Sequence, residues 1–312
     1  GLDVHFWEMS LESVSDWIYT KENKRAAIRE WIEDPIATCN KAKLAEGMAR
    51  VHGKFHERSG LVLDLFDEGM HLVPRFDVPK HWSLYRYHDH GRKEPCAALM
   101  VAVNPLGQKF VVDEYYITDK EIRDNAEGII EMSGNTVIVG PDGEREESRD
   151  GSDVIRTVGD PRSLSKTGDA GQKTIGDEYA SAGLYIMPGS GKRPEHLYPL
   201  VANMMLPDMS RDHISAKTED GLPAKGMPNL VFFDDLVSLR REITTWRMKQ
   251  RAVLTKSGAA EVLEKPEAAN DHLMTCLMLM AEDNPIWVPK KARDVDDVLG
   301  EQTEDEENES II

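Results

Sequence analysis

The stretch HWSLYRYHDHGRKEPCAALMVAVNPLGQKFVVDEYY, residues 81–116, contains three strand-like runs in quick succession. The runs are LYRYHD (84–89), CAALMVAV (96–103) and KFVVDEYY (109–116), each dominated by apolar or aromatic residues. The tight-turn sequence NPLG (104–107) separates the second run from the third and predicts a hairpin. The stretch therefore predicts antiparallel strands at the start of a sheet.

Helices and strands are expected to alternate after this stretch. The pattern predicts a helix (119–132), a polar Gly-rich loop (140–151), a strand (153–159), a helix (174–182), a strand (184–188), a helix (195–206), a strand (229–233) and helices at 235–249 and 271–281. Three antiparallel strands followed by such alternation is the element order of an RNase H-like α/β fold. We therefore expect a mixed sheet flanked by helices, preceded by a small helical and linker segment.

Composition changes along the chain suggest three parts. Residues 1–80 carry helical patterns at 10–34 and 40–50 and then a Gly- and Pro-broken connector, whereas 81–290 hold the predicted α/β domain. Residues 294–309 contain nine acidic residues and no basic one, which is half of the net charge of −18. Because it lacks apolar content to offset ordering entropy, the tail 291–312 is expected to be disordered.

Composition also narrows the class of protein. No run approaches the roughly 18 to 20 apolar residues of a membrane span, and no signal peptide is evident, so we expect an intracellular protein. Cys39, Cys96 and Cys276 form no CxxC pair, which argues against a zinc ribbon or disulfide framework. The net negative charge argues against binding of nucleic acid. Bound divalent cations, however, invert the local electrostatics, and local basic patches are compatible with the net charge.

Three aspartates stand where predicted elements change. Asp89 ends the first strand, Asp160 ends the fourth, and Asp271 opens the last helix. In an RNase H-like sheet the first and fourth strands are neighbours, so these carboxylates are expected to meet. Each taken singly has a plain structural role as a turn residue or helix cap. Together they would repel one another unless a hard cation such as Mg²⁺ or Mn²⁺ is bound.

The chain resembles the nuclease domain of bacteriophage terminase large subunits. The resemblance lies in residues 81–116 and continues through VGDPRSLSK (158–166), TIGDEYASAGLYIMPG (174–189), FFDDLVSLRREITTWRMK (232–249) and NDHLMTCLMLM (270–280). HGKFHERSG (52–60) also resembles the segment by which such proteins leave their ATPase domain. Residues 1–80 are therefore expected to be the end of an ATPase domain and its linker.

The resemblance implies a two-metal endonuclease that cuts double-stranded DNA during phage genome packaging. It makes Asp89, Asp160 and Asp271 the ligands of two divalent cations, Mg²⁺ or Mn²⁺. Many relatives carry a second acid one helical turn after the last aspartate, where this chain has Thr275, so it departs from the family pattern at the second metal. Expected partners are DNA, a portal protein, a small terminase subunit and an upstream ATPase domain, in the host cytoplasm and without a membrane.

Further residues are candidates for supporting roles. His272 and His88 adjoin the predicted site, and Glu114 follows Asp113 on a predicted strand, although packing roles are the alternative for both histidines. The basic residues could contact phosphates or form a solvated helix face. They are Arg162, Lys166, Arg247, Lys249, Arg251 and Lys256.

Two alternatives to the packaging nuclease stay open. The chain could be a non-catalytic module that docks DNA or the portal, which Thr275 favours, or an RNase H-like enzyme of the resolvase or transposase type. PGSGKRP (188–194) contains GSGK but is not a phosphate-binding P-loop. Such a loop needs a glycine where Ile186 stands and a Ser or Thr where Arg193 stands.

Overall fold

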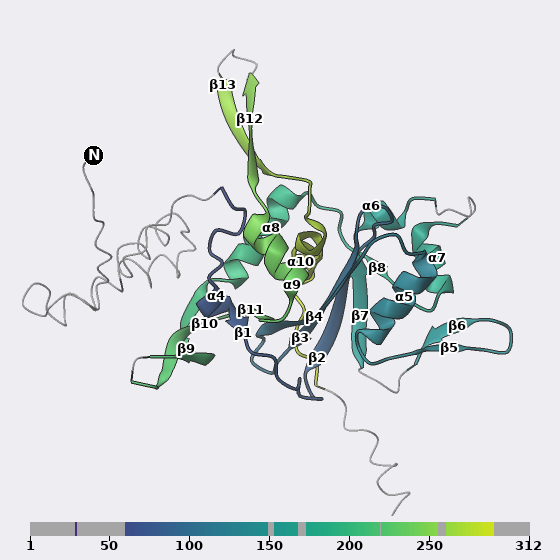
Figure 1. Ribbon diagram of the computed structural model, residues 1–312, viewed down its shortest axis with the longest axis horizontal. Coiled ribbons are helices and arrows are strands. Elements are labelled where there is room, and N and C mark those ends of the chain that lie inside the picture. The colour runs from purple at the N-terminus through teal and green to yellow at the C-terminus, as the bar shows by residue number, and fades with distance from the viewer. Residues whose placement is uncertain are drawn as a thin grey trace, which may run out of the picture.

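The computed structural model describes residues 29, 60–148, 153–167, 173–218, 220–254 and 260–289 (Figure 1). For residues 250–254 and 260–264 it describes the backbone alone. The helices expected at 10–34 and 40–50, the acidic tail and Lys256 lie outside the described residues. So does most of residues 1–80.

The three strands predicted from residues 81–116 form the centre of the sheet. They are β2 (Ser83–Asp89), β3 (Cys96–Val103) and β4 (Lys109–Ile117), with β3 antiparallel to both neighbours. The Asn104 side chain accepts hydrogen bonds from the amides of Leu106 and Gln108, and Gly107 takes a positive φ of 78°. The turn sequence thus builds the predicted β3–β4 hairpin.

Seven strands make the sheet, in the order β1-β11-β4-β3-β2-β7-β8. The outer ones are β1 (Leu72–Val73), β11 (Leu230–Phe233), β7 (Val154–Gly159) and β8 (Met187–Pro188), and each pairs in parallel with its neighbours. Because β3 alone runs against the rest, the sheet is mixed. The central order β4-β3-β2-β7-β8 is that of RNase H-like proteins, so the predicted fold class is confirmed.

Helices cover both faces of this sheet (Figure 1). One buried cluster joins the sheet to α5 (Ile122–Glu131), α6 (Pro161–Leu164) and α7 (Ile175–Ser181). The other joins it to α8 (Pro194–Met204), α9 (Val237–Thr245) and α10 (His272–Asp283). No helix among the described residues is both long enough and apolar enough to cross a membrane.

Side chains of β2 alternate between these two layers. Tyr87 donates its hydroxyl to Asp283 at the end of α10, 2.7 Å away, whereas buried Arg86 binds Glu147 and Ser133 in the other layer. The same alternation places His88 and Asp89 on opposite faces of the sheet. Of the two, only Asp89 lies on the α10 face of the sheet, where it can join a site beside that helix.

The core begins before the expected domain start at residue 81. Val62, Leu63 and Val73 are buried in the main cluster, and β1 pairs with β11. A short helix, α4 (Glu68–His71), precedes β1 and contacts β11. Residues 62–80 therefore pack with the sheet.

Three hairpins differ from the sequence expectation. The expected loop 140–151 contains the turn of a hairpin between β5 (Val137–Val139) and β6 (Arg145–Glu147). A second pair, β9 (Pro207–Lys217) and β10 (Pro223–Pro228), was not predicted. The helix expected at 235–249 was wrong after Thr245, because buried Trp246 is extended and leads into β12 (Met248–Leu254), which pairs with β13 (Ala260–Pro266).

Candidate active site

The parallel pairing of β2 with β7 brings two aspartates to one edge of the sheet. Its last register pair is His88 with Gly159, so Asp89, which ends β2, and Asp160, which directly follows β7, come next. Since neighbouring strands lie about 4.8 Å apart, the two carboxylates leave adjacent strands at the same level. Their negative charges interact, which contributes to raising the pKa of Asp89.

The third aspartate comes from α10, which packs on β2, β3 and β7. Asp271 occupies the N-cap position of α10, but its side chain makes no capping hydrogen bond. Burial raises the pKa of Asp271, and the charge of Asp89 raises it further, against the opposing effect of His272. The charge of Asp89 is therefore coupled to Asp160 on one side and to Asp271 on the other.

Glu242 of α9 supplies the cap that Asp271 does not. Its side chain is fully buried, and Oε2 accepts hydrogen bonds from the amides of Leu273 (2.8 Å) and Met274 (3.3 Å). Burial raises the pKa of Glu242, which these amide hydrogen bonds oppose. The carboxylate of Asp271 is thus left available for another role. No local pattern signals this contact, because it joins two helices that meet only in the fold.

His272 contacts the predicted site directly. Its Nδ1 lies 3.0 Å from Oδ2 of Asp89, and its Nε2 lies 3.8 Å from exposed Glu94. The hydrogen bond with Asp89 raises the pKa of His272, while burial acts the other way. Burial raises the pKa of Asp89, and the His272 contact opposes that shift. His272 is therefore the hydrogen-bond partner of Asp89, and this contact favours the protonated imidazole.

Two other candidates serve elsewhere in the fold. His88 is fully buried on the opposite face, within 3.2 Å of the Tyr179 hydroxyl and 3.5 Å of Cys96, and burial lowers its pKa to about 3. Both oxygens of Glu114 accept amides at the start of α9, from Ser238 (2.8 Å) and Leu239 (2.7 Å). His88 is thus a packing residue, and Glu114 a helix cap.

Asp160 has two partners of its own. It is the N-cap of α6, and Oδ1 accepts hydrogen bonds from the backbone amide (3.1 Å) and Nε (3.2 Å) of Arg162. The capping role considered from sequence is therefore present. The cap uses only Oδ1 of Asp160, and the Arg162 guanidinium lies beside the site.

Whether the site suits a metal depends on residue type and on spacing. Three carboxylates, two of them with raised pKa values, are the oxygen ligands that hard divalent cations prefer. Among the described residues, however, no three Asp, Glu, His or Cys side chains stand together at the spacing of metal ligands. The donors fit a cation chemically, and Arg162 and His272 supply the neighbouring positive charge.

The predicted basic residues fall into two groups. Arg162, beside Asp160, and Lys166, after α6, are exposed, whereas Arg247 and Lys249 are exposed at the base of the β12–β13 hairpin. This hairpin projects from the body beyond α8 (Figure 1). The backbone of Arg251 lies in β12, and Lys256 lies outside the described residues.

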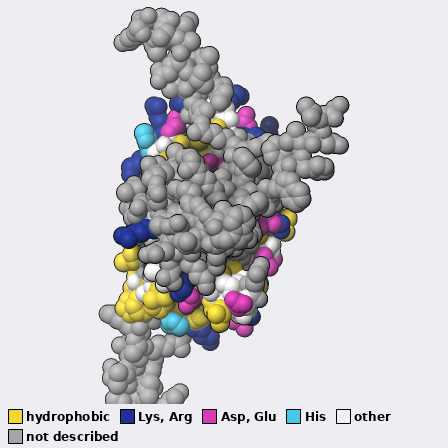
Figure 2. Space-filling view, turned by 90° about the vertical axis from the view of Figure 1, so that its left-hand side faces the viewer, with side chains coloured by type: hydrophobic (Ala, Val, Ile, Leu, Met, Phe, Trp, Pro, Cys, Tyr) yellow, Lys and Arg dark blue, Asp and Glu magenta, His cyan; other side chains and the backbone are white. Residues whose placement is uncertain are grey.

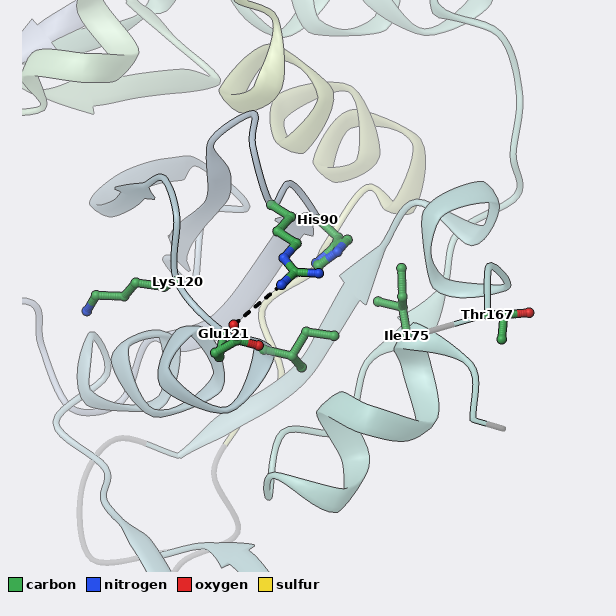
Figure 3. Close-up of a pocket in the computed structure, with 7 residues that line it drawn as sticks. His90, Lys120, Glu121, Thr167 and Ile175 are labelled. Atoms are coloured by element: carbon green, nitrogen blue, oxygen red, sulfur yellow. Dashed lines mark ion pairs between the residues drawn. The ribbon is translucent and has the colours of Figure 1, made fainter. Parts of the chain in front are cut away.

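A small pocket opens at His90, one residue beyond Asp89. Lys120, Glu121, Thr167 and Ile175 also line it (Figure 3). The dashed line in Figure 3 marks an ion pair of 3.5 Å between Arg92 and Glu121, and Lys120 points away from the other side chains. The positive groups of this pocket thus do not converge on one point.

The fold and the site together define a class, an RNase H-like α/β protein with carboxylates at the carboxyl ends of two neighbouring strands, Asp89 and Asp160, and a third, Asp271, at the start of α10. Large terminases are among the solved structures similar to this chain. The large terminase of a thermophilic bacteriophage, in its crystal form 2, is 14% identical, with a TM-score of 0.49, and the similarity covers 86% of this chain and 52% of that one. For the same terminase in complex with ADP the identity is 14%, the TM-score 0.48, and the coverage 71% and 44%.

The nuclease domain of the P22 large terminase is also similar. It is 12% identical, with a TM-score of 0.48, and the similarity covers 72% of this chain and 92% of that one. The matches to the thermophilic phage terminase show that this chain spans about half of that protein's length. These structures belong to the family that the sequence resembles. No protein-family model matches the chain, and no curated protein matches it.

Proposed function

We propose that this chain is the nuclease part of a large terminase, a metal-dependent endonuclease that cuts double-stranded DNA during phage genome packaging. The observation that supports the proposal is that Asp89 follows the strand pairing to the level of Asp160 and is electrostatically coupled to Asp271 at the start of α10. Buried carboxylates that repel one another are costly, and a divalent cation relieves that cost.

The three aspartates would hold Mg²⁺ or Mn²⁺. Two such ions would activate a water on one side of a phosphodiester and stabilise the leaving oxygen on the other. His272 orients the carboxylate of Asp89 through its 3.0 Å contact, and Glu242 fixes the start of α10 and hence the backbone of Asp271. Thr275 adds no charge, so the ligand set consists of three carboxylates.

The proposed substrate and partners follow from the same family. Double-stranded DNA would be held by Arg162 and Lys166 and by the basic residues of the β12–β13 segment. A portal protein, a small terminase subunit and an upstream ATPase domain would position that DNA in the host cytoplasm. We assign the terminase role over the resolvase or transposase role because the resemblance also includes residues 158–189.

Cleavage of supercoiled plasmid by the purified chain tests this proposal. We expect nicked and linear DNA in Mn²⁺ or Mg²⁺ and none in EDTA, because the chemistry requires the bound ions. A folded chain that binds DNA but cuts it in neither metal would contradict the nuclease and favour the docking module. Cutting that persists in EDTA would contradict the role of metal.

A further inference from the structure

The GSGK sequence, which is no P-loop, lies against the candidate active site. A second pocket is lined by Asp160 and Arg162 after β7, by Gly191 and Lys192 of this loop, and by Thr275 and Glu282 of α10. Two cationic side chains thus share one pocket with a proposed metal ligand. Both are well exposed, with 61% of the Arg162 and 59% of the Lys192 side chain accessible.

The loop is held in place by contacts with α10. Oε1 of Glu282 accepts hydrogen bonds from the Ser190 hydroxyl and from Lys192 Nζ, the latter at 3.0 Å. A Cβ added to Gly189 would lie 2.7 Å from Leu279 of the same helix, so the glycine permits this close approach. Loop and helix therefore form one wall of the pocket, and Lys192 is presented at its rim.

The Lys192 ammonium can leave its ion pair with Glu282. Burial acts to raise the pKa of Glu282, but hydrogen bonds from Ser190 and Lys192 outweigh it and lower the pKa. Of this pair, the Glu282 side chain is 13% exposed and the Lys192 side chain 59%, so Lys192 stays solvated when it leaves the carboxylate. Ser190 remains bonded to Glu282 if Lys192 turns to another anion. The Lys192 ammonium can thus exchange a carboxylate for a phosphate oxygen.

We propose that Lys192, together with Arg162, forms a binding site for a backbone phosphate of the DNA strand next to the cleavage site. The assignment rests on the proposed function, because it takes the substrate to be DNA. It assigns the GSGK loop a use that its sequence alone does not suggest. Lysine binds phosphate as a point charge, so the contact needs no P-loop geometry.

The test measures binding of the full chain to a labelled DNA duplex in Ca²⁺ by fluorescence anisotropy over a range of salt concentrations. Each phosphate contact contributes about 0.9 to the slope of log affinity against log salt. Lys192→Ala is expected to weaken binding to duplexes of every sequence and to lower that slope by about one.

Lys225→Ala is the matched control. Lys225 is 55% exposed and paired with Asp212 at 2.6 Å, but it lies in the β9–β10 hairpin, so its loss should leave the slope unchanged. Glu282→Gln removes the carboxylate that competes for Lys192, so this variant should bind DNA at least as tightly as the wild type.

An unchanged slope in Lys192→Ala, while the wild type binds duplex, would overturn the phosphate site and leave the proposed function standing. Equal weakening by Lys192→Ala and Glu282→Gln would overturn it too, because Lys192 would then act only by tethering the loop. A wild-type chain that binds no duplex at any salt concentration would overturn the proposed function as well.

Discussion

Buried and half-buried carboxylates in this protein differ in what they bind. Glu114 and Glu242 accept backbone amides at the starts of α9 and α10, so their charges are matched by helix N-termini. Asp89 has His272, and Asp271 makes no capping bond. The aspartates are therefore the groups left with charge that a metal ion could neutralise.

The cap that Glu242 provides should be measurable as stability. Glu242→Ala leaves the buried amides of Leu273 and Met274 without an acceptor, which should lower the free energy of unfolding by about 1–3 kcal/mol. Glu242→Gln keeps a side-chain oxygen and should lose less. Urea unfolding of both variants checks this, and an unchanged midpoint in Glu242→Ala would show that the contact does not stabilise α10.

Elements with a buried face were predictable, and those without one were not. β2, β3 and β4 appear in sequence as apolar runs because both faces of the sheet are covered, and the turn at Asn104–Gly107 separates two of them. The β12–β13 hairpin projects from the body, so no core enforces an alternating pattern, and its basic sequence looked helical (Figure 1). The aspartates could be proposed from sequence because they stand at element ends, whereas Glu242 acts across helices.

A glycine in α5 shows how packing outweighs helix propensity. A Cβ on Gly128 would lie 2.4 Å from the Tyr115 ring, whose hydroxyl is fixed by Asn125 at 2.9 Å. Ala in place of Gly favours a helix by about 1 kcal/mol, but overpacking costs about 1–3 kcal/mol. Gly128→Ala should therefore be neutral to destabilising by up to about 2 kcal/mol in thermal unfolding.

Gly176→Ala in α7 is the control for this prediction. Its added Cβ would meet Leu164 at 3.5 Å or more, an ordinary contact, so the propensity gain should dominate and stability should hold or rise. If Gly128→Ala stabilised the protein as much as Gly176→Ala, the packing against Tyr115 would not be the constraint on α5.

Two buried histidines, His71 and His213, join distant parts of the chain. His71 of α4 is buried and bonds through Nε2 to the carbonyl of Met205, which follows α8, at 2.9 Å. His213 of β9 bonds to the carbonyl of Met70 at 2.8 Å. Because His71 is buried, its protonation should change the free energy of unfolding.

On the face shown in Figure 2, basic and acidic side chains are interspersed, and hydrophobic ones gather toward the lower edge.

Burial lowers the pKa of His71 below its ordinary 6.5, against the opposing effect of its backbone hydrogen bonds. The folded chain therefore favours neutral His71, and its stabilisation is present above pH 6.5 and lost as the pH falls toward the lowered value. Urea unfolding at one pH above and one well below 6.5 should show a smaller difference for His71→Gln than for the wild type. Equal differences would assign the acid sensitivity to other groups.

Asp89, Asp160 and Asp271 are the residues that we propose as the cutting site. Its most direct test compares Mn²⁺-dependent plasmid cleavage by Asp89→Asn with that by Asp113→Asn, whose carboxyl also has a burial-raised pKa but lies on β4 near Arg75. We predict that the Asp89 variant loses at least about a hundredfold in rate, since metal-bound charge stabilisation is worth several kcal/mol, while the Asp113 variant stays near wild type. Equal rates for folded Asp89→Asn and wild type would exclude Asp89 from the cutting site.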